Sequence, residues 1–475
     1  MSNHPASRQD PRLDPRLDPR MKTFFTLWTG QVLSMLCSAF TGFSMGVWIY
    51  QRTGSATQFA LNSLAMVVTG LVLGQLTGAI ADRWDRRRTL LFSDVGMAGN
   101  TLVLAVLLFL GRLEVWHVYI VTISGAVFNS FRWPAMNGII VQITPPEHLA
   151  RANGLVLAGE TTSSIIAPLL AGTLMAVIGL PGVLVIDAIS FGLFLVILLG
   201  IRIPALRRPC TAGKRKQSLL HDIGEGWAFV YRRPGLVGLL MFSAVNNFLF
   251  GVVEVLFTPL VLGIGSVALL GWSSSIAAAG MLVGSLAMSA WGGPRRRMPF
   301  IVFLIGLQGV LAIVVGIRPM IPLIMAGAFG YMLVVPLLSG TQQTLWQTRV
   351  PHHMQGRIAA VRATIGNAAV PLALAIAGPM ADRIFNPLLA AGGALDGTFV
   401  ATILGVGSHR GIGLLFVAMG LLSIAGAALA YLHPRIRHLE QELPSFVEQA
   451  PQPAQAAPEA PGRPEQSSPA TLAAS

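Results

Sequence analysis

The sequence predicts an all-α membrane protein in which twelve transmembrane helices form two related six-helix bundles. Of the 475 residues, 53% are hydrophobic and only 11% are charged, whereas about 25% of the residues of a soluble protein are charged. The mean hydropathy of +0.65 agrees with this imbalance. Apolar stretches long enough to cross the ~30 Å hydrocarbon core of a bilayer as helices recur along the chain. Lipid is therefore the expected solvent of most of the molecule.

Twelve such stretches follow one another, separated by polar connections. We expect helices over residues 24–50, 56–80, 89–110, 115–141, 150–176, 181–201, 236–262, 268–291, 299–317, 320–345, 357–385 and 410–432. A polar segment precedes the first helix, and a segment rich in Pro, Ala and Gln follows the last.

The basic residues predict the orientation. If both ends of the chain face the cytoplasm, the cytoplasmic tails and loops hold 26 of the 33 lysines and arginines. The opposite side holds five, which are Arg52, Arg112, Arg318, Arg383 and Arg410. Cytoplasmic loops carry the excess of basic residues in membrane proteins, so we expect both termini inside. This distribution also accounts for the net charge of +13 without a nucleic-acid partner.

A long basic connection divides the chain into two halves. We expect a disordered tail over 1–22, six-helix bundles over 23–201 and 236–433, a cytoplasmic central loop over 202–235 and a disordered tail over 434–475. Within the loop, Leu219, Ile223, Trp227 and Val230 share one helical face. That helix either lies on the inner leaflet of the membrane or packs beneath the bundle.

The two halves also resemble each other. Arg151 precedes the fifth span as Arg357 precedes the eleventh, 206 residues later, and the same offset relates Gly172 to Gly378. Two related six-span halves favour a transporter with a central site between them.

The sequence contains no motif for nucleotide binding or catalysis. The P-loop pattern GxxxxGK[ST] is absent, which argues against an ATP-driven pump. The two cysteines, Cys37 and Cys210, make neither a disulfide framework nor a metal site. All nine histidines fall in loops, tails or the ends of spans, where they form no acid–base or metal cluster. We expect no enzyme activity, no cofactor, no metal and a monomer in contact with membrane lipid.

The segment GAIADRWDRRR, which ends the second span, is the most specific motif. It resembles the loop between the second and third helices of the major facilitator superfamily, although Asp85 stands where that family often has glycine. The resemblance implies the major facilitator fold and a gating loop of Gly78, Asp82, Arg83, Arg86, Arg87 and Arg88. A carboxylate at Asp82 near the positive end of the eleventh helix would gain ~0.3–1 kcal/mol, a suitable size for a breakable latch. The alternative is that the arginines only set the orientation.

A second motif lies in the fifth span. Its members are Gly154, Ser163, Ala167, Pro168, Ala171 and Gly172. The spacing resembles the antiporter motif of the same superfamily, with small residues in place of several glycines. Small residues allow close helix contact, and a proline weakens one helical turn. The motif implies export, with ordinary helix packing as the alternative.

The wider resemblance covers residues 21–440 and is to the drug and siderophore exporters of the macrolide-efflux and enterobactin-exporter kind. The segments that carry it are 25–31, 48–51, 53–55, 82–88, 186–187, 190–191, 379–382 and 392–395. It implies a proton-driven exporter (antiporter) of amphipathic small molecules such as macrolides or siderophores, in a bacterial plasma membrane. An importer or a lysophospholipid-type lipid carrier is the alternative.

Charged residues inside the spans are functional candidates because their burial in lipid is costly. Arg132 and Glu160 lie at similar distances from the loop between the fourth and fifth spans. We expect them to pair near the midplane and to take part in proton movement; a static structural pair is the alternative.

The seventh span carries a further carboxylate, Glu254, with Asn246 and Asn247. Glu254 is expected nearer the outer mouth, either as a second proton site or as a site for cationic substrates. Gln31, Asn246 and Asn247 are candidates for lining the cavity. Structural roles are expected for Asp187, and for Asp94 beside the arginine cluster.

Overall fold

The computed structural model describes residues 19–81, 85–145, 148–201, 227–294, 296–351, 354–407 and 409–433. Within these residues the chain is helical almost throughout and contains no strand, so the all-α prediction is confirmed. The two expected tails and most of the central loop lie outside the described residues.

The helices follow one another with short connections. They are α1 (Pro19–Thr53), α2 (Ala56–Ala81), α3 (Arg86–Phe109), α4 (Val115–Ile143), α5 (Leu149–Gly200), α7 (Pro234–Leu262), α8 (Val267–Trp291), α9 (Arg297–Ile317), α10 (Ile321–Arg349), α11 (Gln355–Pro379), the π-helix η4 (Met380–Phe385), α12 (Asn386–Leu388), α13 (Phe399–Leu404) and α14 (Arg410–Leu432).

The start of α1 corrects one expectation. The helix begins at Pro19, inside the expected tail, and Met21 is fully buried. A proline in the first turn of a helix loses no hydrogen bond, because the first N–H groups have no intrahelical partner. Pro19, the last of the repeated prolines, can therefore occupy the first position of α1.

Ten helices among the described residues are long and apolar enough to cross a membrane. One of them, α5, contains two spans in succession, because Gly179 adopts φ 68° and interrupts it between the expected fifth and sixth spans. Glycine takes such a conformation without a steric cost. Helix α4, with 29 residues, is not among the ten but packs against α2 and α3. The arrangement is consistent with the twelve expected spans.

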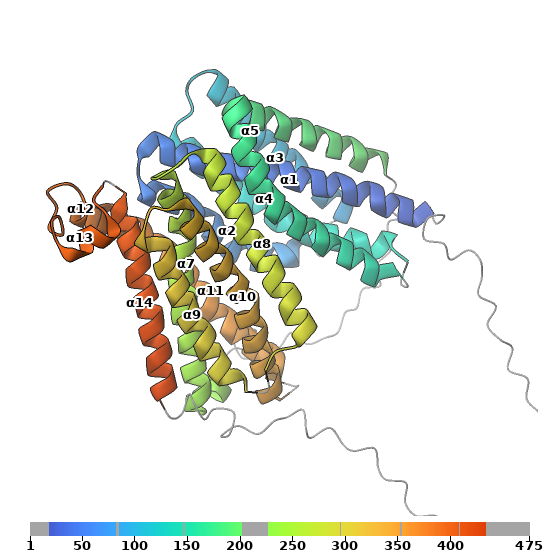
Figure 1. Cartoon of the computed structure of the whole chain (residues 1–475). Coiled ribbons are helices and arrows are strands. Elements are labelled where there is room, and N and C mark those ends of the chain that lie inside the picture. The colour runs from blue at the N-terminus through green and yellow to red at the C-terminus, as the bar shows by residue number, and fades with distance from the viewer. Residues whose placement is uncertain are drawn as a thin grey trace, which may run out of the picture.

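The helices form two bundles that diverge from one end (Figure 1). In the N-terminal half (blue to green) α1 lies against α5, and α4 lies against α2 and α3. In the C-terminal half (yellow-green to red) α14 lies against α9, α10 against α8 and α9, and α11 against α7. We call the end where α1 begins and α14 ends the terminal face, and the opposite end the distal face. The halves contact each other mainly through α5 with α8 and α2 with α11.

The end of the central loop packs against the C-terminal half. A short helix covers residues 227–231, where Trp227 is exposed and Val230 is fully buried. Val230 lies in a core cluster with Leu236 and Met354. At this end the expected amphipathic helix packs beneath the bundle; Leu219 and Ile223 lie outside the described residues.

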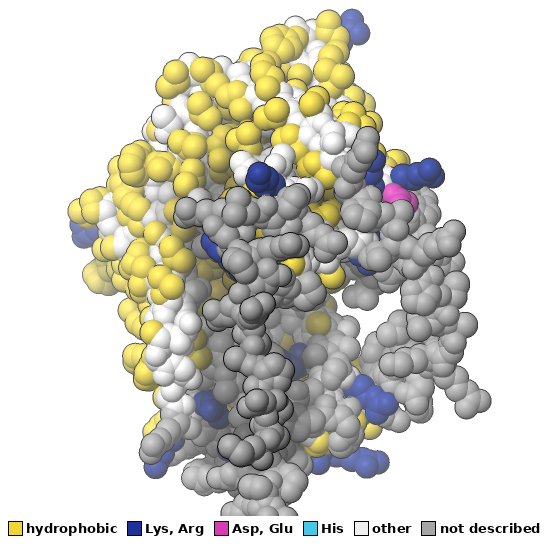
Figure 2. Space-filling view, turned by 90° about the vertical axis from the view of Figure 1, so that its right-hand side faces the viewer, with side chains coloured by type: hydrophobic (Ala, Val, Ile, Leu, Met, Phe, Trp, Pro, Cys, Tyr) yellow, Lys and Arg dark blue, Asp and Glu magenta, His cyan; other side chains and the backbone are white. Residues whose placement is uncertain are grey.

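The outer surface is apolar. Figure 2 shows hydrophobic side chains covering a broad flank, with the lysines and arginines in separate patches. Large apolar side chains such as Val177, Phe303 and Leu429 are more than half exposed. This surface fits contact with lipid.

Candidate functional site

A buried ion pair lies inside the N-terminal half. Arg132 on α4 places Nε 3.1 Å from Oδ1 of Asp94 on α3, and the two side chains are 6% and 1% exposed. Neither oxygen of Asp94 accepts a hydrogen bond from a described residue. Because an unpaired charge away from water is costly, each of these residues depends on the other.

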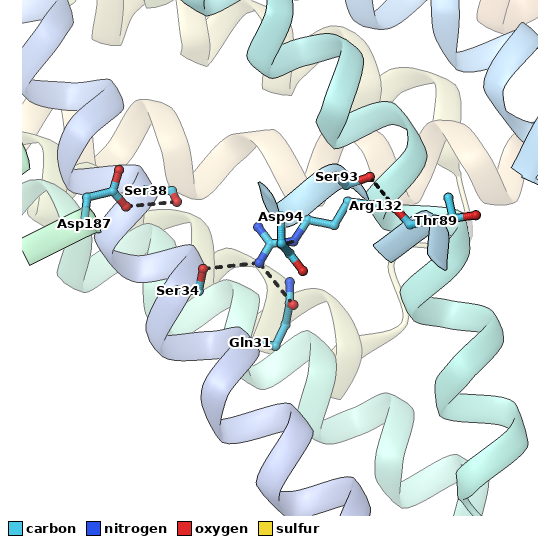
Figure 3. Close-up of polar contacts among 8 residues, drawn as sticks. All are labelled: Gln31, Ser34, Ser38, Thr89, Ser93, Asp94, Arg132 and Asp187. Carbon is cyan, nitrogen blue, oxygen red and sulfur yellow. Dashed lines mark hydrogen bonds and ion pairs between the residues drawn. The ribbon is translucent and has the colours of Figure 1, made fainter. Parts of the chain in front are cut away.

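Arg132 also contacts α1 (Figure 3) and, through Phe194, α5. It donates hydrogen bonds to Oε1 of Gln31 at 3.2 Å and to Oγ of Ser34 at 3.3 Å, both on α1. Its guanidinium lies 5.6 Å from the ring centroid of Phe194 on α5. Gln31, expected to line the cavity, instead forms part of this charge centre.

A second buried carboxylate, Asp187, completes the charge centre. It accepts hydrogen bonds from Thr101 at 2.8 Å, Thr41 at 2.9 Å and Ser38 at 3.3 Å. Asp187 also interacts electrostatically with Arg132. Arg132 therefore has one carboxylate in contact and a second nearby.

The expected pair of Arg132 with Glu160 is wrong. Glu160 is partly exposed on α5, and Arg132 pairs with Asp94. The preceding residue, Gly159, faces α1, since a Cβ there would lie 2.6 Å from Val32. Successive helical residues point about 100° apart, so Glu160 is turned away from that contact. The sequence predicts how deep Glu160 lies along its helix, but not the direction in which its side chain points around the helix axis.

Asp94 also differs from its expected place beside the arginine cluster. It lies eight residues into α3 from Arg86, which is about 12 Å along the helix. At that depth it meets Arg132.

The arginine cluster instead binds backbone carbonyls at the terminal face. Arg86 donates to the carbonyl of Gly138 on α4 at 2.6 Å. Arg87 donates to Leu198 at 3.2 Å and Leu199 at 2.9 Å at the end of α5. Cations stabilise the carbonyl ends of helices, so these arginines tie α3 to its neighbours.

The remaining members of the expected gating loop are less defined. Gly78 lies on α2 and Arg88 is exposed. Asp82 and Arg83 lie outside the described residues.

A cavity lies where the two halves meet. It consists of two adjoining chambers of about 500 Å³ and about 650 Å³. They share Phe59, Ser63, Met66 and Thr258. We call the first the Glu254 chamber and the second the Asp187 chamber, after the carboxylate that lines each.

The seventh span contributes its polar residues to different places. Glu254 lines its chamber and is exposed there. Asn246 is buried. Asn247 lines a separate cavity of about 260 Å³, together with Arg362. Of the three amides expected to line the cavity, none lines either central chamber.

The antiporter-like motif closes one side of the distal face. At Gly172, an added Cβ would lie 2.8 Å from the carbonyl oxygen of Val267, and at Gly271 only 2.5 Å from that of Pro168. Backbone atoms of α5 and α8 thus touch across the two halves. Ala167 and Ala171 are buried against α1, and Ser163 is buried. Gly154 faces open space and takes no part.

A second contact closes the other side of the distal face. Asp382 on η4 accepts hydrogen bonds from the hydroxyls of Ser55 and Thr57, both at 2.7 Å, and from the backbone N–H groups of Ala56 at 3.2 Å and Thr57 at 2.9 Å. It caps the N-terminus of α2 from the opposite half. At Gly378, an added Cβ would lie 2.4 Å from Cα of Thr57.

The conformation is therefore closed at the distal face. Gly172 and Gly378, which the repeat relates, both lie in these contacts. Toward the terminal face the two bundles diverge (Figure 1).

A family model described as Major Facilitator Superfamily matches residues 27–374. The chain belongs to the major facilitator superfamily. The resemblance indicated by the sequence motifs is confirmed. As a member of this superfamily, it is a multi-pass membrane transporter.

Curated relatives of the superfamily cover most of the chain. Macrolide efflux protein A of Streptococcus pyogenes is 28% identical over 379 residues, which are 76% of this chain and 90% of the relative. Multidrug efflux pump Tap of Mycobacterium tuberculosis is 29% identical over 416 residues, 81% of this chain and 88% of the relative.

Solved transporters share the fold. A bacterial homologue of the human lysosomal transporter Spinster superposes with a TM-score of 0.63 at 16% identity, over 90% of this chain and 99% of the other. The nucleoside transporter NupG superposes with a TM-score of 0.65 at 10% identity, over 86% and 99%.

Sequence reasoning missed Asp382 as an inter-half contact and Asp94 as the partner of Arg132. In the sequence, Asp382 stands out only as part of segment 379–382 of the family resemblance. Its partners begin α2 with Ser55 and Thr57, residue types that favour helix starts, but nothing in the sequence places the two ends together.

Proposed function

We propose that this transporter is a proton-coupled exporter of amphipathic small molecules in a bacterial plasma membrane, with both termini cytoplasmic. The observation that carries the proposal is the position of Asp187. It lines the central cavity and belongs to the charge centre of Arg132 and Asp94. A bound molecule and the buried charges can therefore influence each other through one residue.

The proton step is proposed at Asp94. When Asp94 accepts a proton it becomes neutral and no longer holds Arg132. The guanidinium keeps its hydrogen bonds to Gln31 and Ser34 and is drawn toward Asp187. This exchange of partners changes the contacts between α3, α4 and α1. Proton binding thereby favours a different packing of the N-terminal half, and the proton gradient supplies the driving force.

The gating contacts are proposed to alternate. In the conformation described, the two distal contacts are formed, so a substrate enters from the terminal, cytoplasmic face. For release the distal contacts must open and the terminal face must close. On sequence grounds, Asp82 and Arg83 belong to the closing loop, with Asp82 binding the N-terminal end of α11.

Export is supported by the relatives named macrolide efflux protein A and multidrug efflux pump Tap. The apolar lining of the cavity supports an amphipathic substrate. The proposed partners are this substrate, protons and membrane lipid, with the chain acting as a monomer.

Inverted membrane vesicles with an acidic interior test the proposal. A quenched weak-base dye reports the interior pH, and macrolides, siderophores and cationic dyes are added one at a time. We expect one class to cause fluorescence recovery, which Asp94→Asn abolishes and Glu160→Gln retains. If Glu160→Gln abolishes recovery and Asp94→Asn does not, Glu160 is the proton site. Substrate movement only in the opposite direction would indicate an importer or lipid carrier.

A further inference from the structure

The central cavity has a one-sided charge. Among the described residues that line its two chambers, the charged ones are the carboxylates Glu254 and Asp187, and none is Lys, Arg or His. Arg362 lines the separate 260 Å³ cavity, where it donates to Gln343 at 3.0 Å and lies 5.0 Å from the ring centroid of Trp346. An anion in the central chambers would therefore meet two carboxylates and no cation in the lining, and the nearby Arg132 is already paired with Asp94.

The two carboxylates differ in their partners. Asp187 is 1% exposed and accepts three hydroxyl hydrogen bonds. Glu254 is exposed to the cavity, and no described residue donates a hydrogen bond or forms an ion pair with it. A carboxylate at membrane depth without a protein partner is costly unless a ligand or a proton neutralises it.

Aromatic side chains surround the Glu254 chamber. Phe250 lies one helical turn before Glu254 on α7, and its ring is nearly parallel to that of Tyr331, with the centroids 6.1 Å apart. Tyr331 is close enough to Glu254 to interact with it electrostatically. Further aromatic side chains in the lining are Phe59, Phe257 and Phe416. Aromatic faces attract cations by ~0.5–2 kcal/mol each.

Methionines add an adaptable apolar wall. Met66, Met281 and Met332 line the same chamber. Their flexible thioethers fit ligands of different shape. The chamber thus combines one carboxylate, which favours cations, with an apolar lining that fits ligands of different shape.

We propose that the Glu254 chamber is the site of a monocationic amphiphile, such as an amine-bearing or quaternary ammonium or phosphonium compound. The cationic group lies at Glu254, and the apolar body lies against Phe250, Tyr331 and the methionines. The proposal rests on the proposed function and narrows its substrate class: compounds with one positive charge are accepted, and anionic chelators such as catecholate siderophores are rejected.

Equilibrium binding tests this in the purified protein in detergent, where no proton gradient is needed. The cationic probe is tetraphenylphosphonium, whose charge does not depend on pH, and the neutral probe is Nile red. Glu254→Gln is expected to weaken tetraphenylphosphonium binding about tenfold or more and to leave the affinity for Nile red unchanged. Glu254→Asp keeps the charge and is expected to retain most of the cation affinity.

The controls separate a binding role from a folding role. Glu160→Gln removes a carboxylate that does not line the chambers and is expected to bind both probes like the wild type. Size-exclusion profiles verify that each variant is folded. Unchanged tetraphenylphosphonium affinity in Glu254→Gln would overturn the proposal and leave Glu254 as a proton site. Equal weakening for both probes would also overturn it.

The result is independent of the vesicle experiment. Charge-selective binding without proton-coupled recovery would remove the proposed energy source and keep the cation site. Proton-coupled recovery with an anionic compound only would keep the exporter and remove the cation site.

Discussion

The two halves of the molecule share a fold but differ in how the charged residues within their helices are paired. In the N-terminal half every charge of the centre has a partner: Arg132 pairs with Asp94, and Asp187 accepts three hydroxyl hydrogen bonds. In the C-terminal half Glu254 faces the cavity without a partner among the described residues. A set of paired charges can exchange partners when one member is protonated, whereas an unpaired carboxylate is available to a ligand. On this difference rests our proposal that one half couples to protons and the other binds the substrate.

The contacts that close the distal face are, in contrast, symmetric. Gly172 brings α5 against α8, and its counterpart Gly378 brings α11 against α2. The contacts that close the distal face therefore follow the internal repeat, whereas the charged residues of the two halves do not.

Replacing Arg132 by methionine should give the largest effect on the N-terminal half. The change leaves Asp94 buried without its partner, and breaking a buried ion pair from one side costs about 3–5 kcal/mol. We expect a strongly lowered thermal unfolding temperature in detergent, measured by tryptophan fluorescence, and no transport.

The double variant Arg132→Met with Asp94→Asn serves as the control. It contains neither charge, so it should regain much of the stability without regaining transport. Wild-type stability of the single variant would show that the pair does not hold this half together.

Adding a side chain at Gly172 should disturb the symmetric contacts that close the distal face. In Gly172→Val the added carbons meet the backbone of α8, and overpacking costs about 1–3 kcal/mol. We expect the distal face to open. The measurement is the distance between spin labels at Val177 and Phe399, two exposed positions on the distal side, with Cys37 and Cys210 replaced by serine.

Gly154→Val is the matched control, since Gly154 faces open space, and its label distance should match that of the wild type. If Gly172→Val also leaves the distance unchanged, the contact of α5 with α8 does not determine closure.

Loss of the N-cap that Asp382 provides should open the distal face to a smaller extent. Loss of an N-cap costs about 0.5–2 kcal/mol, and Asp382→Asn retains one acceptor oxygen. We expect a partial shift toward the longer distance between the same labels. Asp396→Asn removes a carboxylate that binds the N–H of Gly392 within the same half and should cause no shift; equal behaviour of the two variants would contradict the role of Asp382.

The smallest effect is expected at the arginine cluster. Arg87→Gln loses the charge near the carbonyls of Leu198 and Leu199, an interaction of about 0.3–1 kcal/mol. We expect a slightly lower unfolding temperature and unchanged tetraphenylphosphonium affinity. A large loss of affinity would connect this cluster to the binding site.

The sequence was sufficient for the helices and for the identity of the charged candidates. The expected span 56–80 compares with α2 (Ala56–Ala81), and 268–291 with α8 (Val267–Trp291), because apolar length determines a span. Arg132 and Glu254 stood out because charges are rare in such segments.

The sequence does not predict which residues Arg132 and Asp382 contact. Pairing Arg132 with Asp94 depends on how α3 and α4 are rotated against each other. A single sequence gives the depth of a residue along a helix but not this rotation. The contact of Asp382 with Ser55 and Thr57 joins residues more than 320 positions apart, so it depends on the packing of the two halves.

The division of labour between the halves is tested most directly by comparing exchange with uphill transport of tetraphenylphosphonium in proteoliposomes. Exchange across the membrane requires substrate binding and alternation but no net proton movement. We predict that Asp94→Asn retains exchange and loses uphill transport, whereas Glu254→Gln loses both. If both variants retain exchange, or if Asp94→Asn also loses it while folded, the assignment of coupling and binding to separate halves is contradicted.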